Sequence, residues 1–292
     1  MKVTLKSDRL EVTIDTFGAE LQSVRNVKTN TEYLWHGDKR WWGRRSPVLF
    51  PIVGSVWEGE YRMDGKTYHL GQHGFARDSE FEMQPDTADN EAWFTLNYSD
   101  ATLALYPRRF RLEIGYRLDD DRLQVMWRVT NLDNVEMDFQ IGAHPAFNYP
   151  GFNPNDEIHG YLAFSSRKLR SQLLDRKGCI GSEDIDIELD SEHMLPVTAR
   201  TFDINTIILA DRQVNRVSLL DKNRSPWISV IAQAPLTGIW SPSADCPFIC
   251  IEPWWGRADR VDFKGDFAER EHINRLAPAA SFNASYLIIF EG

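Results

Sequence analysis

Titratable side chains gather in short stretches that also contain glycine, proline or tryptophan. One of them, "CIEPWWGRADR", places Glu252 after the apolar "FICI" and before a proline and two tryptophans, so this carboxylate is expected at the end of a buried strand. A carboxylate in such a place must be paired, hydrogen-bonded or functional. An ion pair with Arg257 or Arg260 is the structural explanation, and catalysis or binding is the other.

A carboxylate beside tryptophans is also typical of a sugar pocket. Pyranose rings present apolar C–H faces that lie on aromatic planes, and their hydroxyls need charged or amide partners. Trp255 is expected to present such a plane, while "IGAHPAFNYP" supplies His144 and "GQHGFARDSEF" supplies His73 and Arg77. His144 alone could be packing filler, a metal ligand or an acid, because its local sequence does not decide between these roles.

Length and charge restrict the class of protein. The chain has 292 residues and a net charge of -10, from 33 basic and 43 acidic residues, which argues against binding to nucleic acid or to an anionic membrane. No apolar run approaches the roughly 20 residues that span a bilayer, and "MKVTLKSDRLEVTID" lacks the apolar stretch of a signal peptide. We expect a soluble, cytoplasmic protein, monomeric or homodimeric, with no nucleic-acid and no membrane partner.

The cysteines predict neither a disulfide framework nor a metal site. Cys179, Cys246 and Cys250 are few and unevenly spaced, and no second Cys or His pair follows the last two at zinc-site spacing. We interpret all three as reduced, buried thiols.

Apolar and polar residues alternate with period two through much of the chain, as at Leu123, Val125, Trp127 and Val129. Turn sequences separate these runs at hairpin spacing, and the best helix candidates, "SADCPF" and "FAEREHINRL", are brief. We predict an all-β fold, a large antiparallel β-sandwich in one domain over residues 1–292. The polar segment 166–195 is expected to form long loops or an extended hairpin.

Several motifs together resemble a known family. "HGFAR", "HPAFN" and "IEPWWG", in this order and with "WGRRSPVLFPIVG" shortly before the first, resemble the aldose 1-epimerase (galactose mutarotase) family, and most of all its LacX-like branch. The resemblance extends from "TFGAELQSV" to the final "SYLIIFEG". It implies a galactose mutarotase-like β-sandwich, with a sugar cleft on a concave sheet face and an isomerase activity on a hexose.

The resemblance also implies roles for single residues. His144 of "GAHPAFN" is similar to the family's general acid, and Glu252 of "CIEPWW" to its general base. His73 of "HGFAR" is similar to a substrate-binding group that helps to polarise the ring oxygen. Arg44 of "WGRRSP" would hold sugar hydroxyls, with Arg45 as the alternative one position on.

Two further matches leave alternatives open. Arg77 matches the arginine of "HGFAR", but it could instead order its loop by pairing with Asp78 or Glu80. Asn205 stands where relatives often carry an aspartate, and Asp203 lies two residues before it. This departure leaves hydroxyl recognition, and hence the identity of the sugar, open.

Interconversion of α and β anomers needs an acid and a base that act together. A base takes the proton of the C1 hydroxyl while an acid protonates the ring oxygen, the ring opens to the aldehyde, and closure on the other carbonyl face gives the opposite anomer. A carboxylate with a pKa of about 4 and an imidazolium with a pKa of about 6.5 suit these roles. The reaction requires no metal and no cofactor.

Other functions remain possible at this stage. A mutarotase for hexose 6-phosphates needs a basic patch, to which Arg44, Arg45, Arg77, Arg257 and Arg260 could contribute. A carbohydrate-binding or sensing protein would keep the fold and the cleft without turnover. A glycoside hydrolase needs a second carboxylate, and no other acidic residue has a comparable aromatic setting.

Overall fold

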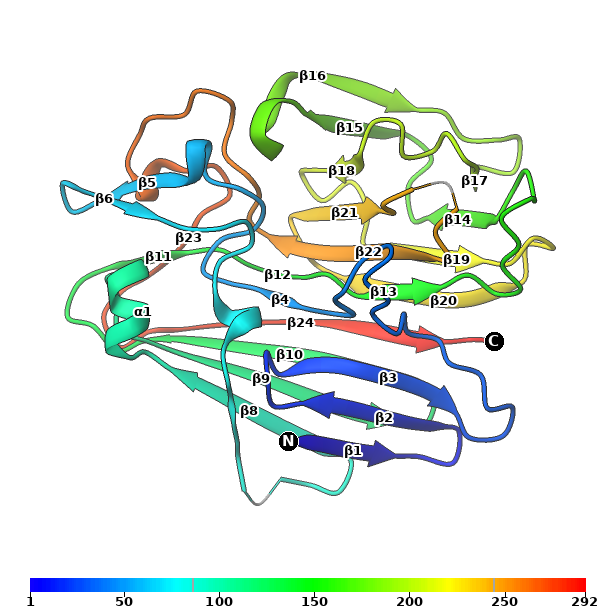
Figure 1. Cartoon of the computed structure of the whole chain (residues 1–292), viewed down its shortest axis with the longest axis horizontal. Coiled ribbons are helices and arrows are strands. Elements are labelled where there is room, and N and C mark those ends of the chain that lie inside the picture. Colours follow the sequence, from blue (N-terminus) through cyan, green and yellow to red (C-terminus); the bar gives the residue numbers. More distant parts are fainter. Residues whose placement is uncertain (86, 244) are drawn as a thin grey trace.

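The computed structural model describes residues 1–85, 87–243 and 245–292. Regular structure in these residues is almost entirely antiparallel strand, so the all-β prediction is confirmed, and two large sheets make up most of the molecule (Figure 1).

The larger sheet contains nine strands. They are β7 (Glu82–Met83), β8 (Glu91–Asn97), β9 (Phe110–Asp119), β10 (Arg122–Asn131), β14 (Gly160–Phe164), β17 (Met194–Val197), β19 (Arg216–Leu220), β20 (Pro226–Ala232) and β24 (Ser281–Phe290). Their order across the sheet is β17-β14-β19-β20-β24-β10-β9-β8-β7.

The second large sheet contains eight strands. They are β4 (Val48–Leu49), β12 (Ile141–Ala143), β13 (Ala146–Asn148), β15 (Leu169–Leu174), β16 (Ile180–Ile187), β18 (Thr206–Leu209), β21 (Leu236–Trp240) and β22 (Phe248–Trp255). Their order is β16-β15-β18-β21-β22-β12-β4, and β13 pairs with β22 beside β12. Within the polar segment 166–195, where the sequence predicts long loops or an extended hairpin, β15 and β16 form an antiparallel hairpin.

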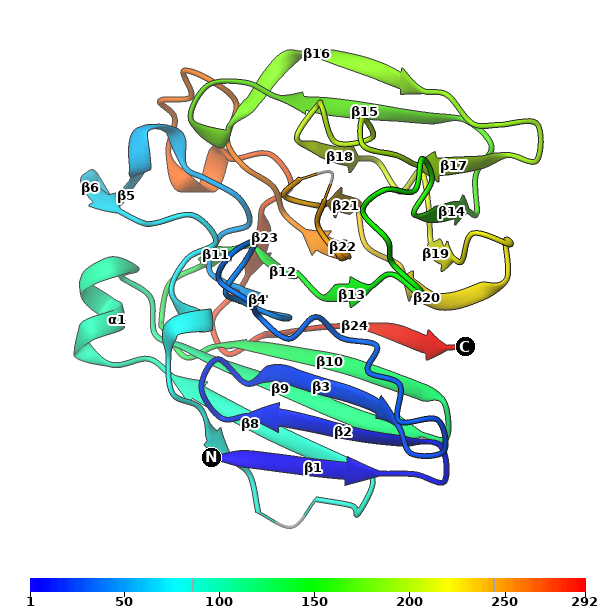
Figure 2. The same ribbon diagram turned by 45° about the vertical axis from the view of Figure 1, so that its right-hand side comes forward.

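Smaller sheets complete the fold. They are a three-stranded sheet of β1 (Lys2–Lys6), β2 (Leu10–Asp15) and β3 (Glu20–Asn26), and the pairs β5 (Glu60–Met63) with β6 (Lys66–His69) and β11 (Met137–Phe139) with β23 (Asn274–Leu276). The three-stranded sheet lies over β8, β9 and β10 (Figures 1 and 2). The hydroxyl of Tyr116 in β9 donates to the carbonyl of Ala19, just before β3, at 2.7 Å. This hydrogen bond joins the nine-stranded sheet to the three-stranded sheet.

Alternation along β22 separates two environments. Ile249 and Ile251 belong to the main core, and Trp255 packs against it, where its ring meets Trp127 of β10 at a centroid distance of 5.5 Å. Because successive side chains of a strand point to opposite faces, Glu252 and Trp254 point away from that core. The eight-stranded sheet therefore has one face on the core and a second face that carries the candidate site.

Helices are few and short. The described residues contain one α-helix, α1 (Asp100–Leu105), which begins where Ser99 and Thr102 cap each other's backbone N–H groups. Four 3-10 turns are η1 (Trp57–Gly59), η2 (Ala76–Asp78), η3 (Arg176–Gly178) and η4 (Phe267–Glu269).

The two helix candidates of the sequence do not form α-helices. "FAEREHINRL" contains only η4 followed by β23, and "SADCPF" includes Ala244, which lies outside the described residues, while its other residues are turn, coil and the start of β22. No helix in the described ranges is long and apolar enough to cross a membrane.

Candidate active site

His144 and Glu252 lie opposite each other across two neighbouring strands. Gly142 of β12 pairs with Trp254, and Ala146 of β13 pairs with Cys250, so the intervening His144 stands opposite Glu252. The ladder is interrupted there, because the backbone N–H of His144 donates to the carbonyl of Pro47 at 3.1 Å. The interruption leaves the His144 side chain beside the carboxylate, with 3.3 Å between Nε2 and Oε2.

Two glycines make room for the indole that supports this carboxylate. A Cβ atom at Gly238, the partner of Glu252 on β21, would lie 2.4 Å from Cζ2 of Trp254, and one at Gly142 would lie 2.8 Å from Cδ1 of the same ring. The Trp254 indole thus occupies space above both glycines. From there its Nε1 donates to Oε2 of Glu252 at 3.2 Å.

Burial shifts the pKa values of the pair in opposite directions. Glu252 is 1% exposed, and burial raises the pKa of its carboxyl well above the usual range, against a smaller lowering by the Trp254 hydrogen bond. Burial lowers the pKa of His144 to about 3, and the charges of Arg77 and Arg44 act in the same direction. The sequence led us to expect ordinary values, which apply only to solvated groups. Burial therefore favours the neutral form of both groups, with the proton of the pair on Glu252 rather than on His144.

The pair also has unused hydrogen-bonding capacity. Among the described residues, Oε1 of Glu252 and Nδ1 of His144 are buried without any hydrogen-bond partner. Native proteins rarely leave buried polar atoms unpaired, so such atoms call for an explanation, and a bound ligand is one that fits a cavity. These atoms, with the 3.3 Å contact, make the pair the chemical centre of the site.

A cavity of about 350 Å³ opens beside the pair, a size within the range of small-molecule sites. The loop before β4, the segment between β6 and β7, the hairpin of β15 and β16, and strands β18, β21 and β22 all contribute to its walls. The lining residues are Trp42, Gly54, Gln72, His73, Arg77, His144, Leu174, Gly178, Ile180, Asn205, Thr206, Ile208, Trp240, Glu252, Trp254 and Ala258.

Aromatic rings surround His144. Trp42 stacks on it with a centroid distance of 4.7 Å and an interplanar angle of 29°, and Trp240 meets it edge-on at 5.5 Å. The sequence analysis did not assign Trp42, Trp240 or Trp254 to the site, although Trp42 begins the motif "WGRRSPVLFPIVG" and Trp254 lies in "CIEPWWGRADR". It named Trp255, which needs correction, because Trp255 points to the core face of β22 and does not line the cavity.

His73 offers a neutral donor to the cavity. Its backbone adopts a φ of 67°, a left-handed conformation that histidine tolerates better than most residues, and the N–H of Gly54 donates to its Nδ1 at 3.1 Å. Because Nδ1 accepts, the ring proton is on Nε2. Burial, with the neighbouring His144 second, lowers the pKa of His73 well below its usual range, so the ring is an uncharged N–H donor at neutral pH.

Arg77 is the arginine that lines the cavity. Its Nη2 donates to the carbonyl of Gln72 at 2.6 Å, while its Nε is buried without a partner among the described residues. Burial, with the charge of Arg44 second, lowers the pKa of Arg77 to about 10, so it stays a cation at neutral pH. The carboxylate of Asp78, 3.7 Å from Nε of Arg77, partly compensates the positive charge of the guanidinium.

Arg44 and Arg45 point in different directions. Arg44 pairs with Asp78 at 2.9 Å beside Arg77, although it is not one of the lining residues. Arg45 donates to the carbonyl of Gln22 at 2.6 Å, away from the cavity. Of the two alternatives, the structure therefore places Arg44 nearer the site.

Arg257 and Arg260 do not pair with Glu252. Both contact Glu271 instead, and Arg257 also donates to the side chain of Gln172 at 2.8 Å. Among the described residues, the ion pair with an arginine that could have explained a buried Glu252 carboxylate is therefore absent.

Asn205, and not Asp203, lines the cavity. Asn205 has a φ of 72° at the start of β18, and its Oδ1 accepts from the hydroxyl of Thr206 at 2.8 Å. Asp203 pairs with Arg200 at 3.3 Å on the surface. Of the two residues that the sequence left open, the amide of Asn205 lines the cavity wall and the carboxylate of Asp203 does not.

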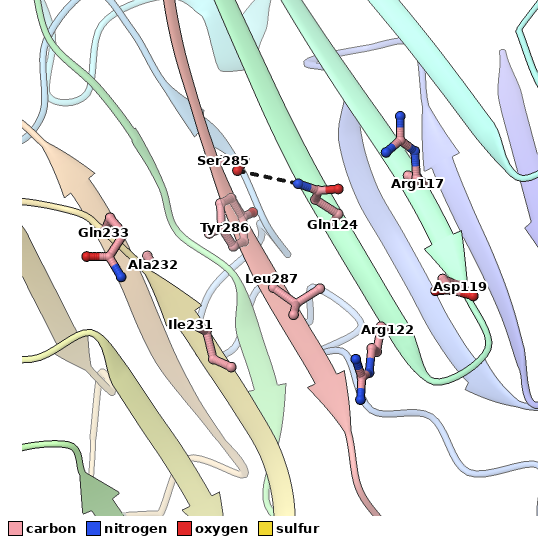
Figure 3. Close-up of a pocket in the computed structure, with 10 residues that line it drawn as sticks. All are labelled: Arg117, Asp119, Arg122, Gln124, Ile231, Ala232, Gln233, Ser285, Tyr286 and Leu287. Carbon is pink, nitrogen blue, oxygen red and sulfur yellow. Dashed lines mark hydrogen bonds between the residues drawn. The ribbon is translucent and has the colours of Figure 1, made fainter.

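A second hollow, of about 460 Å³, lies on the opposite side of the sandwich, over β9, β10, β20 and β24 of the nine-stranded sheet (Figure 3). Gln124 and Ser285 join across it through a 3.5 Å hydrogen bond. Its lining contains no histidine and no tryptophan, so it offers neither an acid–base pair nor an indole to a sugar.

Comparison with known proteins identifies the family of the chain. Residues 1–267 match the family model described as aldose 1-epimerase. The chain belongs to the aldose 1-epimerase family. It is 28% identical over 296 residues to the chromosomal protein LacX of Lactococcus lactis, with 98% of each chain covered, so the LacX-like resemblance is confirmed.

Solved structures of the family share the fold. A galactose mutarotase related enzyme from Lactobacillus acidophilus is 31% identical, with a TM-score of 0.92 over 100% of this chain and 98% of that one. A galactose mutarotase-like protein from Lactobacillus casei is 30% identical, with a TM-score of 0.92 over 99% of each chain. A structure from Escherichia coli described as a putative aldose 1-epimerase, 18% identical with a TM-score of 0.73, covers 99% of this chain and 98% of its own and shares the fold alone.

Proposed function

We propose that this member of the aldose 1-epimerase family is itself a mutarotase, which interconverts the α and β anomers of a free aldohexose. The observation that carries the proposal is the His144–Glu252 pair, joined at 3.3 Å and left with two unpartnered atoms beside a cavity of about 350 Å³. The C1 hydroxyl and the ring oxygen are bonded to the same carbon, so an acid and a base that serve both must lie close together.

In the proposed reaction, Glu252 accepts one proton from the sugar while His144 donates one proton to it. A C1 hydroxyl that donates to Oε1 of Glu252 stabilises the carboxylate form, and the proton of the pair then lies on His144. Glu252 takes the hydroxyl proton while His144 protonates the ring oxygen, and the ring opens. The open-chain state leaves the proton on Glu252, the distribution that burial favours.

Closure reverses these transfers after the C1 carbonyl has turned over, which gives the other anomer. His73 donates its Nε2–H to the ring oxygen, while Arg77 and Asn205 bind other hydroxyls from the cavity wall. Trp42, Trp240 and Trp254 offer indole surface to the C–H faces of the sugar.

The charges favour a free sugar over a sugar phosphate. Arg44 is paired with Asp78, and Arg257 and Arg260 with Glu271, so each already has a carboxylate partner. Arg77 is the lining arginine, and Asp78 lies 3.7 Å from it. A phosphate dianion requires more free donors than this wall presents.

Polarimetry tests the proposal. Freshly dissolved α-glucose, α-galactose and glucose 6-phosphate are followed with the wild type, E252Q and H144N, and with the exposed E192Q and H193N as matched controls. We expect the wild type and both controls to accelerate a free hexose, and E252Q and H144N to lose roughly 10²- to 10⁴-fold in kcat. A folded wild type that accelerates no sugar would overturn the proposal, and sugar binding without turnover would favour a binding protein.

A further inference from the structure

A thiol lies beside the proposed acid–base pair. Cys250 precedes Glu252 by two residues, so both side chains are on the same face of β22. One ligand atom from each of His144, Cys250 and Glu252 lies within 4.8 Å of the others, and all three residues are buried. The spacing of cysteines along the chain could not predict this cluster, because His144 comes from the break between β12 and β13.

We propose that His144, Cys250 and Glu252 form a binding site for a zinc-like divalent transition metal ion, and that the bound ion inhibits the enzyme. Imidazole nitrogen, thiolate sulfur and carboxylate oxygen are the three ligand types that zinc takes from proteins. Three protein ligands leave a fourth position, which faces the cavity that His144 and Glu252 line.

The distances are compatible with a tetrahedral ion after small movements. Bonds of about 2.0–2.3 Å imply that neighbouring ligand atoms in a tetrahedral zinc site lie about 3.3–3.8 Å apart. His144 and Glu252 are already 3.3 Å apart at Nε2 and Oε2, and separations of up to 4.8 Å close with side-chain shifts on the order of 1 Å. The ion would enter from the cavity and replace the direct contact between the two residues.

The nearest charges act in both directions. Arg77 and Arg44 lie close enough to lower the pKa of His144 and so oppose a cation, but each has Asp78 beside it. In the described part of the chain, no lysine or arginine pairs with Glu252, and its Oε1 has no hydrogen-bond partner. Deprotonated Glu252 and Cys250 would together neutralise a divalent ion, which offsets the cost of burying each charge alone. His144 would bind the ion as the neutral imidazole and so would add no charge.

Binding must therefore be coupled to proton release. A cysteine binds a metal ion as the thiolate, so the ion has to displace the proton of the Cys250 thiol. Metal ligands bind in their deprotonated forms, and affinity accordingly rises with pH. This coupling distinguishes the site from metal binding by carboxylates on the surface, which are ionised throughout the neutral range.

Cobalt spectroscopy tests the site without reference to activity. Metal-free wild type, C250S and C246S are titrated with CoCl₂, and Cys246 serves as the matched control because it is a buried thiol four residues away and outside the cluster. We expect a thiolate-to-cobalt charge-transfer band in the wild type and in C246S, and none in C250S. C250A provides a second variant in case the serine disturbs the strand.

Zinc affinity measures how much Cys250 contributes to metal binding. In competition with a chromogenic chelator, the wild type and C246S should bind one equivalent of ZnCl₂, and C250S should bind at least about tenfold more weakly, because even groups that only orient a ligand contribute 10- to 100-fold. Equal affinity in wild type and in both Cys250 variants, or no cobalt–thiolate band, would overturn the site.

The metal site stands on its own, whereas the inhibition by the bound ion rests on the proposed mutarotase function. ZnCl₂ should slow mutarotation by the wild type and C246S, and much higher concentrations should be needed for C250S. If the cobalt band depends on Cys250 but no sugar is turned over by any sample, the metal site stands and the mutarotase proposal fails. If turnover by the wild type persists at saturating zinc, the inhibitory role is overturned.

Discussion

Trp254 donates its indole Nε1–H to Oε2 of Glu252 at 3.2 Å, from two residues further along the same strand. The indole fits there because Gly238 and Gly142 have no side chains to exclude it. This hydrogen bond opposes the effect of burial on the carboxyl group, because it lowers the pKa that burial raises. The Trp254 hydrogen bond thus favours the ionised form of Glu252, although burial has the larger effect.

Replacement of Trp254 by phenylalanine should slow the reaction by about 10- to 100-fold, which corresponds to the roughly 1.5–3 kcal/mol of a hydrogen bond to a charged group. The ring would still fill space, but the carboxylate would lose its indole donor. The matched control is W255F, because Trp255 packs on the core side of β22 against Trp127. W255F should reduce the melting temperature with kcat unchanged, and an equal loss of kcat in both variants would contradict this role for the indole.

The sequence motifs led us to propose His144 and Glu252 as an acid–base pair, and the local sequence explains part of their surroundings. Apolar residues before Glu252 predict a buried strand, and the polar groups of "HGFAR" and "HPAFN" had to meet a partner from elsewhere in the chain. Burial of Glu252 and its contact with His144 agree with that interpretation. The all-β fold followed from period-two alternation in the same way.

Other features depend on register and packing, which local sequence does not determine. A shift of one residue exchanges the faces of a strand, and this is why Trp254 rather than Trp255 faces the cavity. The pKa of about 3 at His144 results from burial by rings such as Trp42 and Trp240, which come from distant segments. The proximity of Cys250 to His144 likewise follows from the pairing of β13 with β22.

Asn205 should contribute to hydroxyl recognition, whereas Asp203 should not. Asn205 has a φ of 72°, so N205G removes the side chain and keeps a backbone that glycine adopts readily. We expect N205G to raise KM about tenfold, as the loss of one or two hydrogen bonds of about 1 kcal/mol each implies. D203A, which removes a surface ion pair with Arg200, should leave KM unchanged. A KM effect from D203A alone would reverse the assignment.

E252Q should change how stability depends on pH. Because burial raises the folded-state pKa of Glu252 above the ordinary glutamate value of about 4.5, its contribution to the free energy of unfolding is present below about pH 4.5 and is lost as the pH rises through the folded-state pKa. Glutamine does not titrate, so the melting temperature of E252Q relative to wild type should be higher at pH 8 than at pH 4.5. Calorimetry at both values tests this, and a constant difference would show that Glu252 titrates normally.

The pH profile of kcat/KM reports the proton count of the free enzyme's pair. The singly protonated pair is the active form in the proposed reaction, and a second proton binds only near the His144 pKa of about 3. Activity should therefore stay level from the raised pKa of Glu252 down to about pH 4, and should fall as the pH rises through that pKa, where the pair loses its one proton. Polarimetric rates from pH 4 to 9, corrected for spontaneous mutarotation at each pH, test this. An acid limb with its midpoint between pH 6 and 7 would mean that His144 keeps its ordinary pKa of about 6.5 despite its burial.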